Sequence, residues 1–572
     1  MSDGHSRSID VEKMPDSIVQ NNTKVKLWLF RQLSSEALKR LHDNQGTFIP
    51  RSAIGKLSDI NIIRSVLQQE EVFSGEEPEC TATYIQKYAP KLFLIAVHVR
   101  LDLRELKNCF LHGVSDDHLT VEDVSEESRW IKDDYNRAVW ISELQRHRWE
   151  YFAAFFTRDE AQFHQEFEPR KIIPYTYMKE CGKGAFSIVF EVELEKSHQM
   201  LYRLKHNDNP RLALKRLDRR KTQDTAFQHE QNLLKSLLGN KHLHIIQLLA
   251  TYRQNEIWYF LFPLANCNLA EYMSAREPEH SEKYITWKLN QILGLATGIQ
   301  AIHDRQPDRM GASSSQPFLG LNNQNAQSIQ TGYHHDIKPQ NILHFKELEV
   351  EITTPYPELG VYQISDFGVG KFQTGNLGDS SKGTRHPRGT VTYWAPESRI
   401  TAGRLGHSRL KDVYHISRPY DMWAFGCVIM EMLVWLIKGR DGLKEFKNGR
   451  NGPAEQDSKA EESDAYWIAT PNFQGAQLRP TVWGTLNALR EEEITRRSRC
   501  LKLMIKLVAD ILRVKPKERL VISEVVTRLE EIVEIAKHED GFNGTIPSKI
   551  QTPESSPPIL NIIGASDDSA KM

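Results

Sequence analysis

The chain has 572 residues, of which 40% are hydrophobic and 26% are charged. A chain of this length and composition can bury a large core and is expected to form two or three domains. Lys and Arg total 74 and Asp and Glu total 75, so the overall charge gives no indication of nucleic acid or a membrane as partner.

Six cysteines are spread along the chain without a C-x-x-C pair, so their spacing indicates neither a zinc site nor a disulfide framework. This usage fits a reducing compartment. The first residues lack the apolar segment of a secretory signal, and the apolar run at 425–437 is too short to span a bilayer and contains Glu431. We interpret that run as a buried core helix and expect a cytoplasmic or nuclear protein.

Residues 1–23 are polar and are expected to be disordered, whereas residues 24–165 show a mostly helical pattern. In RAVWISELQRHRWEYFAAFF, apolar side chains recur at steps of three and four residues, as in a packed helix. This predicts a small helical domain of unknown role. Its histidines show no metal-ligand spacing, and we interpret them as ordinary structural or surface residues: His98, His112, His118 and His147.

The pattern changes near residue 172. YTYMKECGKGAFSIVFEVEL alternates apolar and polar residues around a glycine pair and predicts a hairpin; LALKRL and EIWYFLFPLA predict strands, and TAFQHEQNLLKSLL predicts a helix. Beyond residue 284 the pattern is mainly helical, so we expect an α+β fold with a strand-rich and a helix-rich lobe. Polar stretches at 304–331, 346–359 and 441–463 are expected to be surface loops, and 538–572 a disordered tail.

The glycine pair Gly182-x-Gly184 is a weak signal by itself, because most such matches are ordinary turns. Glycines do let a backbone approach phosphate oxygens closely, and Ser187 is small enough to preserve that approach. Lys215 follows on the next strand and Glu230 on the next helix. A lysine held by a helix glutamate can direct its ammonium group at phosphates.

The stretch GYHHDIKPQNIL, residues 332–343, has the residue types of a phosphoryl-transfer loop. Asp336 can accept the proton of an attacking hydroxyl, and Lys338 can neutralise charge on the transferring phosphoryl group. Asn341 and Asp366, the latter in the sequence Asp366-Phe367-Gly368, can hold a metal ion. These two residues are the candidate metal ligands.

Further motifs follow in a fixed order: Ala395-Pro396-Glu397 at the end of GTVTYWAPE, then DMWAFG, then Arg519 in KPKERL. In this order the chain from about residue 173 to 536 resembles a eukaryotic protein kinase catalytic domain. The resemblance implies a bilobal fold, ATP and Mg²⁺ as cofactors, protein substrates, and an ion pair between Glu397 and Arg519.

The resemblance also implies roles for single residues. Lys338 two residues after Asp336 is typical of serine/threonine kinases, and Thr390 matches a threonine that bonds both residues in those enzymes. Asp421 in DMWAFG would anchor an apolar column that contains His334. The expected nucleotide-binding residues, besides Lys215, Glu230 and Asp366, are Gly182, Lys183, Gly184, Ala185, Phe186, Ser187, Val189, Ala213, Phe262, Leu264, Ala265 and Leu343.

His335 stands where the resemblance implies an arginine, which in many kinases binds a phosphate on the activation segment. An imidazole lacks the rigid fork of donors of a guanidinium group. We therefore hypothesise that activity does not require phosphorylation of Ser380, Ser381 or Thr384 in that segment.

Two alternatives remain open from the sequence. One is a pseudokinase scaffold, although such proteins typically lose the strand lysine, the catalytic aspartate or the metal aspartate that this chain retains. The other is a small-molecule phosphotransferase of related fold, which the Ala-Pro-Glu motif and Arg519 argue against. The helical domain directly precedes the first kinase strand, and we hypothesise that it docks on the small lobe and serves a regulatory partner.

Overall fold

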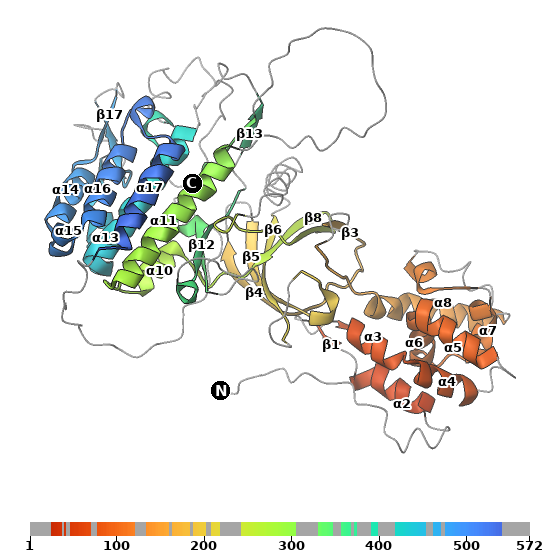
Figure 1. Ribbon diagram of the computed structural model, residues 1–572. Helices are drawn as coiled ribbons and strands as arrows, with labels where there is room; N and C mark the ends of the chain where they lie inside the picture. The colour runs from red at the N-terminus through yellow and green to blue at the C-terminus, as the bar shows by residue number, and fades with distance from the viewer. Residues whose placement is uncertain are drawn as a thin grey trace, which may run out of the picture. The chain divides into compact units, whose positions relative to one another are not determined.

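A computed structural model gives the fold (Figure 1). It describes residues 25–36, 39–41, 46–69, 77–111, 113–120, 133–158, 163–183, 187–201, 208–217, 242–304, 330–346, 356–367, 371–374, 391–398, 418–453, 462–470 and 475–539. The chain divides into two compact units. One consists of Met1–Lys179, Glu191–Leu212 and Leu249–Ile257, and the other of Glu180–Phe190, Ala213–Leu248 and Trp258–Met572.

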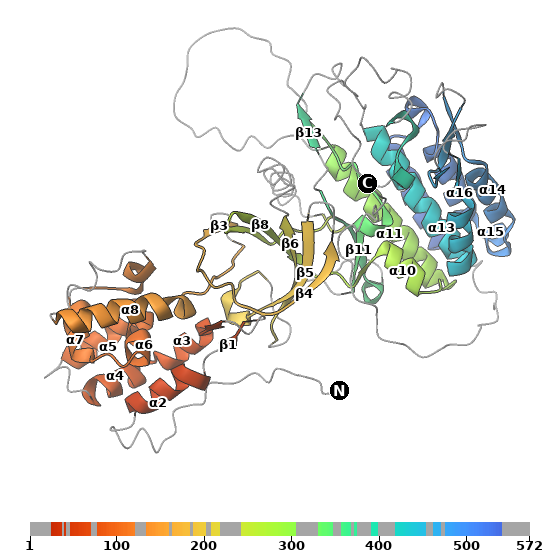
Figure 2. The same cartoon turned by 180° about the vertical axis from the view of Figure 1, so that it is seen from behind.

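The N-terminal region is a helical bundle, seen from two sides in Figures 1 and 2. Its helices are α2 (Val25–Arg31), α3 (Arg51–Leu57), α4 (Ile60–Gln69), α5 (Glu77–Tyr88), α6 (Pro90–His98), α7 (Leu103–Leu111) and α8 (Asp134–Tyr151). A π-helical turn (Gln32–Glu36), a 3₁₀ turn (Asp116–Thr120) and the short pair β1 (Lys39–Arg40) and β2 (Thr47–Phe48) complete it. The apolar face of each helix turns inward, and α6 lies in the core with Leu92 to Val97 all at most 2% exposed.

Residues of the first unit that follow strand β5 (Ser187–Leu194) contact this bundle. The Nε2 atom of His198 accepts a hydrogen bond from the Arg51 N–H (3.0 Å), and the Ser197 hydroxyl accepts one from the Ser52 N–H (3.1 Å). Both N–H groups lie at the start of α3, where the backbone has no partners of its own. The Phe48 ring packs edge-on against the His198 ring at 5.6 Å. Within the first unit, the helical region therefore contacts the segment that follows β5.

A six-stranded sheet follows, in the order β3-β7-β8-β6-β5-β4. Besides β5, its strands are β3 (His164–Phe167), β4 (Tyr175–Lys183), β6 (Arg211–Leu217), β7 (Ala250–Gln254) and β8 (Ile257–Pro263). The predicted hairpin and the two other predicted strands are present. The pairing of β3 with β7 is parallel. The predicted helix in TAFQHEQNLLKSLL lies outside the described residues.

The C-terminal part is mainly helical, and α11, α13, α16 and α17 lie side by side in both views (Figures 1 and 2). Its helices are α10 (Leu269–Ala275), α11 (Glu282–His303), α13 (Arg418–Gly449), α14 (Pro480–Glu491), α15 (Glu493–Arg497), α16 (Arg499–Ile511) and α17 (Ile522–Ala536). Short 3₁₀ turns cover Pro339–Asn341, Pro357–Leu359, Val391–Tyr393 and Pro516–Glu518.

The C-terminal part also contains several small sheets. A three-stranded sheet has the order β12-β11-β9, formed by β9 (Cys267–Asn268), β11 (Ile342–Phe345) and β12 (Val361–Ile364). Two-stranded pairs join β10 (Gln330–Tyr333) to β13 (Lys371–Thr374), β14 (Gly452–Pro453) to β15 (Glu462–Ser463), and β16 (Trp467–Ala469) to β17 (Ala476–Leu478).

Helix α13 contains the apolar run at 425–437, whose side chains are buried. By length and composition it is the one helix of the described residues that could cross a membrane, and 89% of its apolar window is buried inside the protein. This agrees with the predicted core helix. The helix kinks at Gly439, which has a φ of 71°. It then continues to Gly449, so the expected loop over 441–463 is helical in its first part.

Candidate active site

The backbone that leads into the candidate catalytic loop is held by the carboxylate of Asp421, which lies in the first turn of α13 and is 1% exposed. The N–H groups of His334 and His335 donate to its two oxygens, at 2.7 and 2.8 Å. His303, at the end of α11, bonds the same carboxylate through Nε2 at 3.0 Å. Burial raises the pKa of Asp421, but the hydrogen bond from His303 and the charges of the nearby imidazoles leave that pKa below its ordinary value.

His335 is fixed by this attachment and by aromatic packing. Its φ is 72°, a left-handed conformation that costs a non-glycine residue about 1–3 kcal/mol. Its ring lies 4.1 Å from the ring of Tyr333 and 6.0 Å from that of Tyr420, and only 3% of the residue is exposed. The side chain that replaces the expected arginine is therefore part of the core below the loop.

Three polar side chains of the loop converge on one another. The Lys338 ammonium lies 2.9 Å from Asp336 Oδ2, and the Asn341 amide donates to the same oxygen at 2.9 Å and to the Asp336 carbonyl at 2.8 Å. All three residues are at most 8% exposed. The Oδ1 atom of Asn341 is buried and has no hydrogen-bond partner among the described residues. A buried carbonyl oxygen in this state is suited to a ligand or cation.

The second candidate metal ligand, Asp366, follows β12 and has a φ of 60°. Its Oδ1 lies 3.0 Å from the ammonium of Lys215, a residue on β6 that is 4% exposed. Burial raises the pKa of Asp366, but the charge and the hydrogen bond of Lys215 outweigh this effect. The pKa of Asp366 is therefore lower than its ordinary value. The structure thus joins Lys215 to Asp366, the two residues expected to face the phosphates and the metal.

Ser365 connects the two halves of the site. Its N–H and its hydroxyl both donate to the Asn341 carbonyl, at 2.8 and 2.9 Å, and its own carbonyl bonds His334 Nε2 at 2.9 Å. The His334 ring also packs edge-on against Phe367 at 4.9 Å. Asn341 and Asp366 are therefore held on adjoining chain segments.

The expected nucleotide-binding residues lie mainly on the strands. Val189, Ala213 and Leu343 are fully buried, Phe262 and Ala265 are at most 4% exposed, and Leu264 is half-buried. Gly182 and Lys183 end β4, and Ser187 begins β5. Several expected residues lie outside the described part of the chain: Gly184, Ala185, Phe186, Glu230, Ser380, Ser381, Thr384 and Thr390.

The expected ion pair between Glu397 and Arg519 is present. Two guanidinium nitrogens each lie 2.6 Å from one carboxylate oxygen, which is the bidentate geometry that arginine favours. Arg519 also donates to the carbonyls of Arg513, Pro419 and Val514. The guanidinium group is fully buried, and each of its nitrogens has an acceptor.

Sequence reasoning missed the supports below the loop. His303, Ser365 and Tyr420 have no role predicted from the sequence, although His303 lies in AIHDRQ, directly before the polar stretch that precedes the loop. Nothing in its local pattern shows that it reaches a carboxylate 118 residues further on. Only the folded chain brings these groups together.

Two family models match the chain. The protein kinase domain model matches residues 329–529, and the model of protein tyrosine and serine/threonine kinases matches residues 175–307. The chain belongs to the eukaryotic protein kinase superfamily. The two matches leave residues 308–328 between them, within the polar stretch at 304–331 that is expected to be a surface loop.

Curated relatives agree with this placement. The chain is 24% identical over 393 residues to the serine/threonine-protein kinase MAK of Rattus norvegicus, covering 67% of this chain and 50% of the relative. It is 26% identical over 279 residues to the serine/threonine-protein kinase PKH3 of Eremothecium gossypii, covering 48% of this chain and 30% of the relative. The chain spans half or less of the length of these relatives.

Proposed function

We propose that this protein is an active serine/threonine protein kinase that transfers the γ-phosphoryl group of ATP to protein hydroxyl groups. The observation that supports this most directly is the convergence of Lys338 and Asn341 on Asp336, together with the ion pair between Lys215 and Asp366. A scaffold without activity has no requirement for all five of these groups in this arrangement. The names of the curated serine/threonine relatives agree with the proposal.

Each polar residue has a proposed task. Asp336 accepts the proton of the attacking serine or threonine hydroxyl through a carboxylate oxygen. Lys338, 2.9 Å from that carboxylate, orients it and places a positive charge where the phosphoryl group is transferred. Asn341 fixes the carboxylate through its amide group. Phosphoryl transfer needs positioned reactants and compensating charge more than covalent chemistry, which is what these side chains supply.

Mg²⁺ and ATP fit the remaining groups. The Asn341 Oδ1 atom and the Asp366 carboxylate are hard oxygen donors of the kind that Mg²⁺ prefers, and Lys215 would hold the α- and β-phosphates. When bound, Mg²⁺ neutralises negative charge on the phosphate oxygens. The lowered pKa of Asp366 keeps its carboxylate ionised for this role.

The proposal is tested by transfer of labelled γ-phosphate from Mg–ATP to a mixed protein substrate, followed by phosphoamino-acid analysis. We compare wild type with Asp336→Asn and with the exposed control Asp441→Asn. We expect phosphoserine or phosphothreonine from wild type and the control, and a loss of at least about 100-fold in Asp336→Asn. Bound ATP without transfer by wild type would instead support the scaffold, and transfer only to small molecules would support a small-molecule phosphotransferase.

We propose that phosphorylation of the activation segment does not control the activity of this protein. His335 is buried against Tyr333 and Tyr420, which supports a core role rather than a phosphate-binding one. We expect the triple variant of Ser380, Ser381 and Thr384 to alanine to keep kcat within about twofold of wild type. A large loss of kcat in that variant would show that the segment is a phosphorylation switch.

A further inference from the structure

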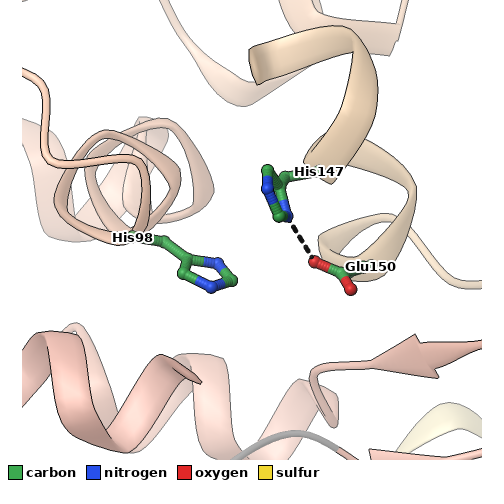
Figure 3. Close-up of side chains that lie close together, drawn as sticks. All are labelled: His98, His147 and Glu150. Atoms are coloured by element: carbon green, nitrogen blue, oxygen red, sulfur yellow. Dashed lines mark hydrogen bonds and ion pairs between the residues drawn. The ribbon is translucent and has the colours of Figure 1, made fainter. Parts of the chain in front are cut away.

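Two histidines and a glutamate of the helical region form a cluster outside the candidate active site. His98 is the last residue of α6, and His147 and Glu150 lie three residues apart on α8. In Figure 3 the His98 ring faces the His147–Glu150 pair from the opposite helix. One ligand atom from each residue lies within 4.8 Å of the others, and all three are half-buried. Because 49 residues separate the two histidines in sequence, their spacing gave no metal signal.

Neighbouring side chains already orient two of the three groups. The Tyr151 hydroxyl bonds His98 Nδ1 at 2.9 Å, which leaves the Nε2 atom of that ring for another ligand. The Thr47 hydroxyl donates to Glu150 Oε1 at 2.6 Å. Metal-binding imidazoles and carboxylates are typically fixed in this way by outer hydrogen bonds, which also set the ring orientation. An incidental surface ion pair has no need of these supports.

The donor set indicates which ion fits. Two imidazoles and one carboxylate suit Zn²⁺, whereas Mg²⁺ and Ca²⁺ prefer oxygen ligands alone. A second carboxylate, Glu143, lies 3.5 Å from His147 and adds negative charge beside the cluster. Zn²⁺ bonds of about 2.0–2.2 Å place tetrahedral donors roughly 3.4 Å apart. Since the ligand atoms lie within 4.8 Å of one another, side-chain rotations that move these atoms by roughly an ångström would bring them to zinc-binding distances.

We propose that His98, His147 and Glu150 form a Zn²⁺ site that joins helices α6 and α8. Three protein ligands leave the fourth coordination position to water. The site adjoins the contact between the bundle and residues 197–198, because the Glu150 carbonyl accepts a hydrogen bond from the Ile49 N–H at 2.8 Å, two residues before Arg51. Bound Zn²⁺ therefore stabilises the part of the bundle that makes this contact.

The test is a zinc titration of the full-length protein against a chromophoric chelator, with Mg–ATP present at saturation. The variants are His98→Gln, His147→Gln and the near-isosteric Glu150→Gln, and the matched control is His118→Gln, an exposed histidine of the same region. We expect wild type and the control to hold one more tightly bound equivalent than each of the three variants. Co²⁺ should give the visible absorption bands of a four-coordinate ion in wild type and lose them in the variants.

Two further measurements distinguish a ligand role from a structural one. Tyr151→Phe keeps all three ligands and removes only the supporting hydroxyl, so we expect zinc affinity to fall about 10–100-fold without loss of the site. Zinc should raise the midpoint of thermal unfolding in wild type but not in Glu150→Gln, with metal-free midpoints showing that both proteins fold. Equal zinc stoichiometry and affinity in wild type and His147→Gln, or no zinc retained by wild type, would overturn the proposal.

Discussion

Two lysines of this protein are almost equally buried but have opposite surroundings. Lys215 on β6 is 4% exposed, and its ammonium lies 3.0 Å from the carboxylate of Asp366. Lys288 on α11 is 2% exposed and bonds the hydroxyl of Tyr362. Five aromatic rings surround its nitrogen, with centroids at 4.0 to 5.5 Å: Tyr272, Trp287, Tyr362, Trp435 and Tyr284.

The difference is that the charge of Lys215 has a carboxylate partner, whereas the amine of Lys288 has none among the described residues. A buried charge is expensive unless a partner compensates it. Asp366 compensates Lys215 and has its own pKa lowered in return, so that pair stays charged. Burial lowers the pKa of Lys288 well below its ordinary value, and the nearby Arg276 lowers it further. We therefore expect Lys215 to act as a cation and Lys288 to be largely neutral in the folded protein.

The largest effect is expected from Lys215→Met, compared with Lys288→Met in the same phosphate-transfer assay. Removing the ammonium group that would hold the phosphates should lower kcat/KM by roughly 10²–10³-fold, the size seen when one charge-stabilising group is lost. Lys288→Met should leave transfer close to wild type. Equal losses in the two variants would show that activity follows core integrity rather than the Lys215 charge.

The next effect concerns a buried cation with a complete set of partners, Arg519. Arg519→Met would leave the Glu397 carboxylate without its bidentate partner, and breaking such a buried pair costs about 3–5 kcal/mol. The midpoint of thermal unfolding of the kinase part should fall by more than about 6 °C. The matched control is Arg513→Met, whose exposed pair with Asp510 should contribute less than about 1 kcal/mol. A drop no larger than that of the control would contradict the expectation.

In contrast to Arg519→Met, Lys288→Met should increase the stability of the protein. Methionine has a similar length and is apolar, so it removes the cost of burying an amine and should stabilise the protein by up to about 2 kcal/mol at pH 7. Denaturant unfolding of wild type and variant measures this difference. A lower midpoint in the variant would instead mean that Lys288 is charged and that the aromatic rings stabilise it as a cation.

The stability difference between wild type and Lys288→Met should also depend on pH, in a direction that the lowered pKa of Lys288 determines. Because the folded-state pKa of Lys288 is lowered, the unfolded chain binds one more proton between that pKa and about 10.4. Wild-type stability should therefore rise with pH through this window, relative to Lys288→Met. The advantage of the variant should shrink between pH 7 and pH 10, and a growing advantage would rule out a neutral Lys288.

The sequence predicted the parts of the fold that local patterns determine. Alternation around Gly182 predicted the hairpin of β4 and β5, and the apolar run at 425–437 predicted the buried part of α13. It did not predict that α13 continues past Gly439, since the charged residues after this kink resemble a loop in composition. The periodicity of apolar residues and the local composition indicate which face of a helix is buried, but they do not show where an exposed helix ends.

In the candidate site, too, the sequence predicts residues that lie close together in the chain but not contacts between distant residues. Asp336, Lys338 and Asn341 lie within six residues of one another, so a linear motif contains them. His303 and Asp421 come together across 118 residues, and His98 and His147 across 49, which spacing alone does not show. Lys288 is the clearest case, because a single lysine on an apolar helix would ordinarily be assigned to the surface.

The smallest effect is expected from Tyr362→Phe, which removes only the hydroxyl that Lys288 bonds. A net hydrogen bond between neutral groups contributes about 1 kcal/mol, whereas one to a charged group contributes about 1.5–3 kcal/mol. A neutral Lys288 therefore predicts a loss near the lower value, measured by denaturant unfolding at pH 7. The loss should vanish in the Lys288→Met background, because the phenol then has no amine to bond. A loss above about 1.5 kcal/mol would indicate an ammonium group that depends on this oxygen, and Lys288 would then be charged like Lys215.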